Sequence, residues 1–236
     1  MAITLQERTL RRALWITTAV LSGLGLGAEL IHHRAPSLDW SMLPFLSLSV
    51  EGNLPTWYSS LLLFGCGVLL LLIGAGARQG GARFARRWSL LGAIFTFMSL
   101  DEAVELHEQL GRLVKGSGVL HFSWVIPAAV IVLGIGLAYL PFLIHLPRPT
   151  RRRFLVAGVL YVGGALLLEL PLGWWTERAG EHSLGYALID WVEETLEMLG
   201  AALFLLSLLR YLREQHGELR LAPPAEDPPP AEGPPS

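Results

Sequence analysis

The stretch at residues 55–77, PTWYSSLLLFGCGVLLLLIGAGA, decides the fold because it contains no charged residue over 23 consecutive positions. At the ~1.5 Å rise of an α-helix, this stretch covers about 35 Å, enough to cross the ~30 Å hydrocarbon core of a bilayer. Five further stretches are apolar enough for a tilted spanning helix: residues 13–31, 88–104, 122–146, 154–170 and 185–212. The sequence therefore predicts an all-α polytopic membrane protein with six transmembrane helices.

The composition of the chain supports this interpretation and argues against other classes of protein. Of the 236 residues, 52% are hydrophobic and 16% are charged, whereas ordinary soluble chains are about 25% charged. A net charge of −2 argues against nucleic acid as a partner. The alternating ten-residue segments of a membrane β-barrel are missing, which leaves helices as the spanning elements. We therefore expect the lipid bilayer to be the main partner of the chain.

Arginines are distributed unevenly between the two sides of the predicted bundle. Clusters of three, four, four and three arginines, 14 of the 18 basic residues, occupy the N-terminal segment, the second and fourth connections and the C-terminal segment. These four segments share one side when six helices cross, and the positively charged side is cytoplasmic. We therefore expect an inner (plasma) membrane protein with both termini in the cytoplasm. Its segments would be a cytoplasmic N-terminus at 1–12, a transmembrane domain at 13–212 and a cytoplasmic tail at 213–236, proline-rich and disordered from about residue 222.

Acidic residues show the opposite distribution, since fourteen of the twenty lie at or toward the predicted outer face. Four of them lie inside helices at matching depth, about 20–25 Å from the cytoplasmic boundary: Glu29, Asp101, Glu169 and Glu197. A carboxylate at this depth costs about 2.5–3.5 kcal/mol, and such residues mark ion, proton or metal sites. Because only four basic residues lie on the outer side, protons, a bound metal or both must neutralise the remaining carboxylates.

Helical spacing places further acids in rows. On the third predicted helix, three acids at i, i+4 and i+7 would share one face: Asp101, Glu105 and Glu108. On the sixth predicted helix, three acids repeat this spacing, and Glu193 flanks them as Glu102 flanks the first row: Asp190, Glu194 and Glu197. Glu29 and His32 present a carboxylate and an imidazole at i and i+3, as in carboxylate-bridged di-metal bundles. Two facing rows would form an acidic cleft.

These patterns predict a metal site between the first, third, fifth and sixth helices. The expected ligands are His32, Asp101, Glu105, Glu108, Glu169, Asp190 and Glu197. Glu29 or Glu194 would act as a bridging ligand or a general base. A ligand set rich in carboxylates with one or two imidazoles favours iron or manganese, with zinc as a further candidate, and the expected cofactor is thus a divalent transition metal.

Three motifs carry a resemblance to a known group of proteins: EGNLPTWYSS at 51–60, SLDEAVELHE at 99–108 and EETLEMLG at 193–200. They resemble an uncharacterised family of bacterial six-helix multi-pass membrane proteins, a resemblance that implies no activity. A fainter similarity is to the alkaline-ceramidase-like membrane hydrolases, whose zinc site combines serine, aspartate and three histidines, including a His-x-x-x-His pair. This chain contains no His-x-x-x-His, which argues against zinc amide hydrolysis, although the residue types are supplied by Ser59, Ser60, Asp101 and His32.

The leading interpretation is a metal-dependent membrane enzyme whose site opens to the outer leaflet and acts on a lipid or quinone-like substrate. An alternative is a cation or proton transporter that uses the same carboxylates. However, the cytoplasmic halves of the third and sixth helices carry no charge between Trp88 and Leu100 or between Met198 and Leu209, so a path would close halfway. A structural or assembly subunit of a membrane complex is the third alternative.

Overall fold

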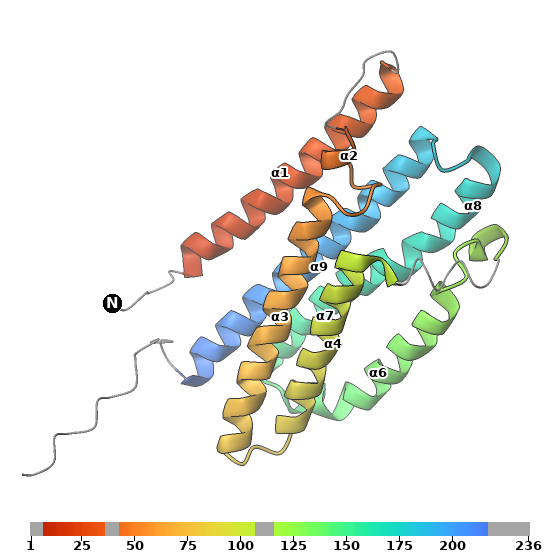
Figure 1. Cartoon of the computed structure of the whole chain (residues 1–236). Helices are drawn as coiled ribbons and strands as arrows, with labels where there is room; N and C mark the ends of the chain where they lie inside the picture. Colours follow the sequence, from red (N-terminus) through yellow and green to blue (C-terminus); the bar gives the residue numbers. More distant parts are fainter. Residues whose placement is uncertain (1–6, 36–42, 107–115, 217–236) are drawn as a thin grey trace, which may run out of the picture.

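The computed structural model describes residues 7–35, 43–106 and 116–216, and every regular element within them is helical (Figure 1). The long helices are α1 (Glu7–Arg34), α3 (Leu54–Gln79), α4 (Ala85–Val104), α6 (Val125–His145), α7 (Arg148–Val162), α8 (Glu169–Ala179) and α9 (Leu184–His216). The short elements are α2 (Leu43–Leu46), the 3-10 turn η1 (Gly118–Leu120) and the π-helical segment η2 (Gly163–Leu168), which joins α7 to α8. The all-α prediction is confirmed for this part of the chain. The tail predicted from residue 222 lies outside it.

Five helical segments are long and apolar enough to cross a membrane: Arg8–Arg34, Leu54–Gln79, Val125–His145, Arg148–Ala179 and Leu184–Gln215. Each overlaps one of the six apolar stretches, and the fourth combines α7, η2 and α8. The third predicted stretch corresponds to α4, whose 20 residues carry four charges at their ends: Arg86, Arg87, Asp101 and Glu102. α4 is therefore too highly charged to count with the five, and a sixth crossing stays a prediction.

The two kinds of charge gather at opposite ends of the bundle (Figure 1). One end, here called the arginine end, contains the starts of α1, α4 and α7 and the last turns of α3 and α9, where the arginine clusters lie. The other, here called the acidic end, contains the last turns of α1, α4 and α8 and the start of α9. Arg34 and Arg178 at the acidic end and Glu214 at the arginine end are exceptions to this distribution.

α4 is held against α3 by small residues. Ser60 and Ser99 each donate a hydrogen bond to the other's carbonyl oxygen, with Oγ···O distances of 2.8 and 2.9 Å. Further along, a Cβ built on Gly92 would lie 3.0 Å from the carbonyl oxygen of Gly67, so the two backbones touch. Small residues allow helices to approach closely in an apolar environment, where polar contacts between them also stabilise the pair. This packing accounts for the position of α4 beside a far more apolar helix.

Aromatic side chains fill the interior toward the arginine end. The ring of Trp88 lies 4.7 Å from that of Phe142, and Phe204 contacts both Phe95 and Phe154, at 4.8 and 4.7 Å between ring centroids. The buried residues of this cluster, which we call the aromatic core, are all uncharged in the described chain: Cys66, Leu70, Ile73, Trp88, Tyr139, Phe142, Leu146, Phe154, Ala157, Phe204, Leu208 and Leu212. Close-packed apolar and aromatic side chains therefore fill this part of the bundle.

Polar contacts join α1 to its neighbours nearer the acidic end. The hydroxyls of Thr18 and Tyr58 lie 2.9 Å apart, which connects α1 to α3. Ser22 connects α1 to α9 in two ways: its Oγ lies 2.7 Å from the hydroxyl of Thr195, and its carbonyl oxygen accepts a hydrogen bond from Nε1 of Trp191 at 2.9 Å. These contacts hold α1 against α9 through Trp191 and Thr195.

Candidate functional site

Six acidic side chains from three helices form the most distinctive polar feature of the bundle. We call them the carboxyl cluster: Glu102 of α4, Glu169 of α8, and Asp190, Glu193, Glu194 and Glu197 of α9. Glu193 interacts electrostatically with Glu169, and Glu194 interacts with Glu102, so α9 carries the centre of the cluster. The charged groups that act most strongly on Glu193 and Glu194 are all carboxyls.

Glu193 is the most buried member of the carboxyl cluster. Only 6% of the residue is exposed, and its Oε2 has no hydrogen-bond partner within residues 7–35, 43–106 and 116–216. An ionised carboxylate buried in this way is strongly unfavourable unless it is paired or hydrogen-bonded. Glu193 therefore requires a proton or a bound cation.

Two tyrosines line the carboxyl cluster. The hydroxyl of Tyr161, a half-buried residue of α7, hydrogen-bonds to Glu197 and also lies within electrostatic range of Glu102. Tyr186, from the first turns of α9, lies within range of Asp190 and Glu169. A phenolic hydroxyl both donates and accepts hydrogen bonds, so these residues provide polar partners at two sides of the cluster.

The π-helical segment η2 brings α8 to the carboxyl cluster. Gly164 of η2 faces α9 so closely that a Cβ there would lie 2.8 Å from the carbonyl oxygen of Glu193 and 3.0 Å from Cγ of Glu197. Glu169 directly follows η2 and is itself buried. π-Helical turns inside α-helices occur frequently at functional sites. The combination of η2 and Gly164 therefore places a carboxylate of one helix against two of another.

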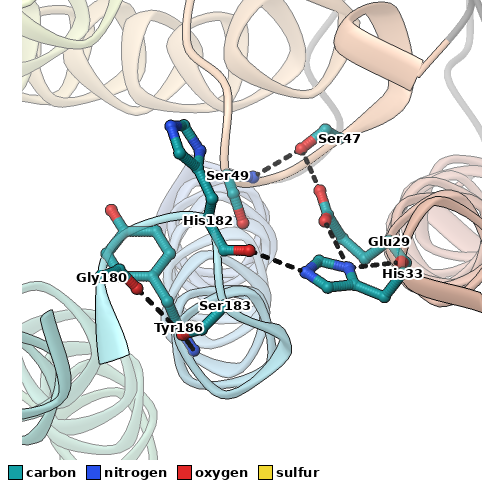
Figure 2. Close-up of polar contacts among 8 residues, drawn as sticks. All are labelled: Glu29, His33, Ser47, Ser49, Gly180, His182, Ser183 and Tyr186. Carbon is teal, nitrogen blue, oxygen red and sulfur yellow. Dashed lines mark hydrogen bonds and ion pairs between the residues drawn. The ribbon is translucent and has the colours of Figure 1, made fainter. Parts of the chain in front are cut away.

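A second group of polar residues lies at the acidic end, around Glu29 (Figure 2). Glu29 is 5% exposed and accepts a hydrogen bond from Oγ of Ser47, which is also buried. Nδ1 of His33 lies 2.9 Å from the carbonyl oxygen of Glu29 and 4.0 Å from its Oε2. Nε2 of His33 lies 3.2 Å from the carbonyl oxygen of His182, in the loop between α8 and α9. This group therefore connects the end of α1 to the loop that precedes α9.

The structure places His32 differently from the i, i+3 prediction. His32 is exposed, and its ring lies edge-on to that of His33 at 5.3 Å, whereas His33, at i+4, turns toward Glu29. Residues at i and i+4 lie on the same helix face, and the burial of Glu29 selects the neighbour that points into the bundle. The Glu29–His32 pair is thus not formed in the described structure.

The predicted row on the third helix is wrong for Glu105. α4 ends at Val104, and Glu105 adopts a left-handed conformation with φ +57°, so it leaves the helical repeat. Its Oε1 would lie 3.8 Å from a Cβ on Gly52, beside the connection that precedes α3. Asp101 remains within α4, half-buried, while Glu108 lies outside the described residues. The side chain of α4 that belongs to the carboxyl cluster is Glu102.

The predicted acids on the fifth and sixth helices do come together. Glu169, Asp190, Glu194 and Glu197 all belong to the carboxyl cluster, whereas Glu102 and Glu193 were expected only to flank it. A signal for Glu193 exists in the sequence, because Asp190, Glu193 and Glu197 stand at i, i+3 and i+7 and share a helix face as well as the chosen row does. Burial against η2 decides between these two faces.

The arrangement in the described ranges does not by itself form a metal site. No three histidine, cysteine, aspartate or glutamate side chains of residues 7–35, 43–106 and 116–216 converge closely enough to hold one ion. The cluster can nevertheless hold protons, share hydrogen bonds with the two tyrosines, or close around a cation after side-chain rotation. The predicted divalent transition metal thus stays a prediction.

Comparison with known proteins places the chain in a family. A family model described as a domain of unknown function (DUF8692) matches residues 13–212, which include α1 to α9 almost completely. No curated protein and no solved structure matches the chain at a significant level. The match agrees with the resemblance to an uncharacterised family, and nothing in these comparisons shows a similarity to alkaline-ceramidase-like hydrolases.

Proposed function

Because the chain belongs to the family of the domain of unknown function DUF8692, whose description assigns no activity, we propose a function from its carboxyl cluster. The protein is a multi-pass membrane protein that binds a cation inside the bundle, taken up from the acidic end. The arginine end faces the cytoplasm, so in a bacterial cell the cation enters from the outer side of the inner membrane.

One observation carries this proposal: the carboxyl of Glu193 is buried among three other carboxyls without a hydrogen-bond partner for Oε2 in the described chain. Acids at membrane depth are expensive and mark ion or proton sites. A cation that binds between these groups removes their mutual repulsion and compensates for their burial. A structural role alone gives no reason to gather six acids in one place.

The aromatic core supports binding rather than passage through the membrane. Its buried residues are uncharged and lie between the carboxyl cluster and the arginine end. An ion that leaves the cluster toward the cytoplasm would have to cross this close-packed layer without a carboxylate partner from the core. The transport alternative therefore has less support than a site that fills and empties from one side.

We further propose that the bound cation serves chemistry on a lipid or quinone-like substrate at the outer leaflet. A divalent metal such as manganese, iron or zinc would act as a Lewis acid, with Glu194 as the general base. Glu29 was the other candidate base, but its contacts with Ser47 and His33 favour a role in fixing the acidic end. Tyr161 and Tyr186 would supply hydrogen bonds to a polar head group at the cluster.

Elemental analysis of the purified protein tests the proposal. We expect a bound divalent metal after exposure to manganese, iron or zinc, and its loss in Glu197→Gln. Glu177→Gln serves as the control, since Glu177 is exposed on α8, where it accepts a hydrogen bond from the backbone N–H of Gly118. Protein that stays free of every metal, with a thermal stability that none of them changes, would contradict the proposal.

A further inference from the structure

We infer that the cation of the carboxyl cluster is a hard, oxygen-ligated divalent ion of the manganese and calcium type, centred on Glu193 between η2 and α9. This inference rests on the proposed function and names the ligand class of the same site. It assigns the ligands to Glu193, Glu169 and Glu197, and it excludes His32 from the set.

Glu193 is buried without full hydrogen bonding in the described chain. It is more than nine-tenths buried, and Oε2 lacks a hydrogen-bond partner in the described residues, although Glu169 and Glu197 interact with it electrostatically. Burying a carboxylate without a partner is strongly unfavourable, and a bound cation compensates for this cost. The side chain is therefore the natural centre of a cation site.

The second step is the chemistry of the donors around Glu193. Among the described residues, the charged groups that act most strongly on Glu193 and on Glu194 are carboxyls, and the hydroxyls of Tyr161 and Tyr186 also lie within range of the cluster. The other candidate ligand types lie elsewhere: His33 contacts Glu29, and Cys66 belongs to the aromatic core. Oxygen-only sites suit manganese, magnesium and calcium, whereas zinc and iron favour imidazole or thiolate.

The third step is the distance between the helices. The contact of Gly164 with the Glu193 backbone and with Cγ of Glu197 fixes η2 against α9, and Glu169 follows η2 directly. No three donors in the described ranges already share one point. Each glutamate has three side-chain torsions, and the inferred site requires rotation about them to bring carboxylates from both helices to one ion. A larger, flexibly coordinated ion tolerates such an assembly better than an octahedral magnesium ion does.

The test is titration of the detergent-purified full chain with Mn²⁺, followed by electron paramagnetic resonance and by the thermal unfolding midpoint. We expect Mn²⁺ to bind and to raise the midpoint, because a ligand that binds the folded state stabilises it. Glu193→Gln should weaken Mn²⁺ binding by about tenfold or more. The same variant should unfold at an equal or higher temperature without metal, since the isosteric amide removes a buried acid. Glu169→Gln provides a second ligand variant if Glu193→Gln does not give folded protein.

Two control variants make the result specific. Glu181→Gln changes an exposed acid of the α8–α9 loop, and His32→Ala changes the exposed imidazole of α1; both should bind Mn²⁺ as the unmodified chain does. Equal Mn²⁺ binding by Glu193→Gln and the unmodified chain would overturn the inference. Binding of zinc or iron that is lost in His32→Ala, with no Mn²⁺ binding, would also overturn it and leave the proposed function intact. If no cation binds, both this inference and the proposed function are wrong.

Discussion

The backbone of Gly164 in η2 lies directly against the backbone of Glu193 in α9, so close that a Cβ on Gly164 would come within 2.8 Å of the Glu193 carbonyl oxygen. This contact joins the one π-helical segment of the described residues to the most buried acid of the carboxyl cluster. A π-helical turn would be expected to widen the helix, and glycine removes the side chain that would otherwise keep α9 away. The geometry of the cluster therefore depends on the absence of a Cβ at this position.

We predict that Gly164→Ala destabilises the protein by about 1–3 kcal/mol, as expected for overpacking at a tight contact. The matched control is Gly163→Ala, the preceding residue, where a Cβ would meet nothing within 4 Å and where φ −67° suits any residue. Alanine there should be neutral or stabilising by up to about 1 kcal/mol. Thermal or urea unfolding in detergent measures both variants. Equal stabilities for the two would show that η2 and α9 are not in contact.

The helices could be predicted from the sequence because their apolar stretches are long and are bounded by arginines. All six predicted stretches overlap observed helices, and four of the acids chosen as site residues lie in the carboxyl cluster: Glu169, Asp190, Glu194 and Glu197. Helix length depends on local composition, which a single sequence records directly. The end of α4 was harder to predict, since the left-handed Glu105 interrupts a segment whose composition suits a continuous helix.

The choice of helix face could not be predicted from the same information. On α9, the rows that contain Glu193 and Glu194 differ by one residue, about 100° around the helix, and only packing against η2 favours Glu193 as the most buried. On α1, His32 and His33 are adjacent, and the buried contact of Glu29 with Ser47 determines which ring turns inward. Tertiary contacts, which the sequence does not state, therefore selected the site residues.

His33→Ala should loosen the acidic end, because its ring lies between the carbonyl oxygens of Glu29 and His182. We expect a loss of about 0.5–1.5 kcal/mol of stability, the usual contribution of one hydrogen bond. Amide hydrogen exchange in the 180–183 loop should also become faster. His32→Ala is the control and should change neither quantity, since His32 is exposed. Faster loop exchange in His32→Ala than in His33→Ala would show that the two rings have been assigned the wrong roles.

The orientation of the bundle can be tested with alkaline phosphatase, which is active only outside the cytoplasm. Fusions after residue 35 or 180, both at the acidic end, should be active, and fusions after residue 82, 150 or 215 should be inactive. This follows from the arginine clusters at the ends of α3 and α9 and at the start of α7. The opposite pattern would place the carboxyl cluster toward the cytoplasm. If α4 does not span the membrane, only α6 and the α7–α8 segment cross between residues 82 and 180, and the fusions after these two residues would report the same side.

Glu169 and Glu193 interact across the contact between α8 and α9, so we predict that their effects on stability are not independent. In saturating Mn²⁺, Glu169→Gln and Glu193→Gln should each remove the stabilisation that the ion provides. The double variant should then lose little more free energy of unfolding than the more destabilised single variant, because the stabilisation by one bound ion can be lost only once. Thermal or urea unfolding of the four proteins gives the coupling free energy, which should be about 0.5–3 kcal/mol.

A matched pair gives this cycle its reference. The double variant Glu193→Gln/Glu181→Gln changes one residue of the carboxyl cluster and one exposed acid outside it. The effects of these two substitutions on the free energy of unfolding should add within about 0.5 kcal/mol. Additive effects of Glu169→Gln and Glu193→Gln would mean that each carboxyl is satisfied by its own protein or water partner. The carboxyl cluster would then be a set of separate structural contacts, because residues that share one cation cannot contribute independently to its binding.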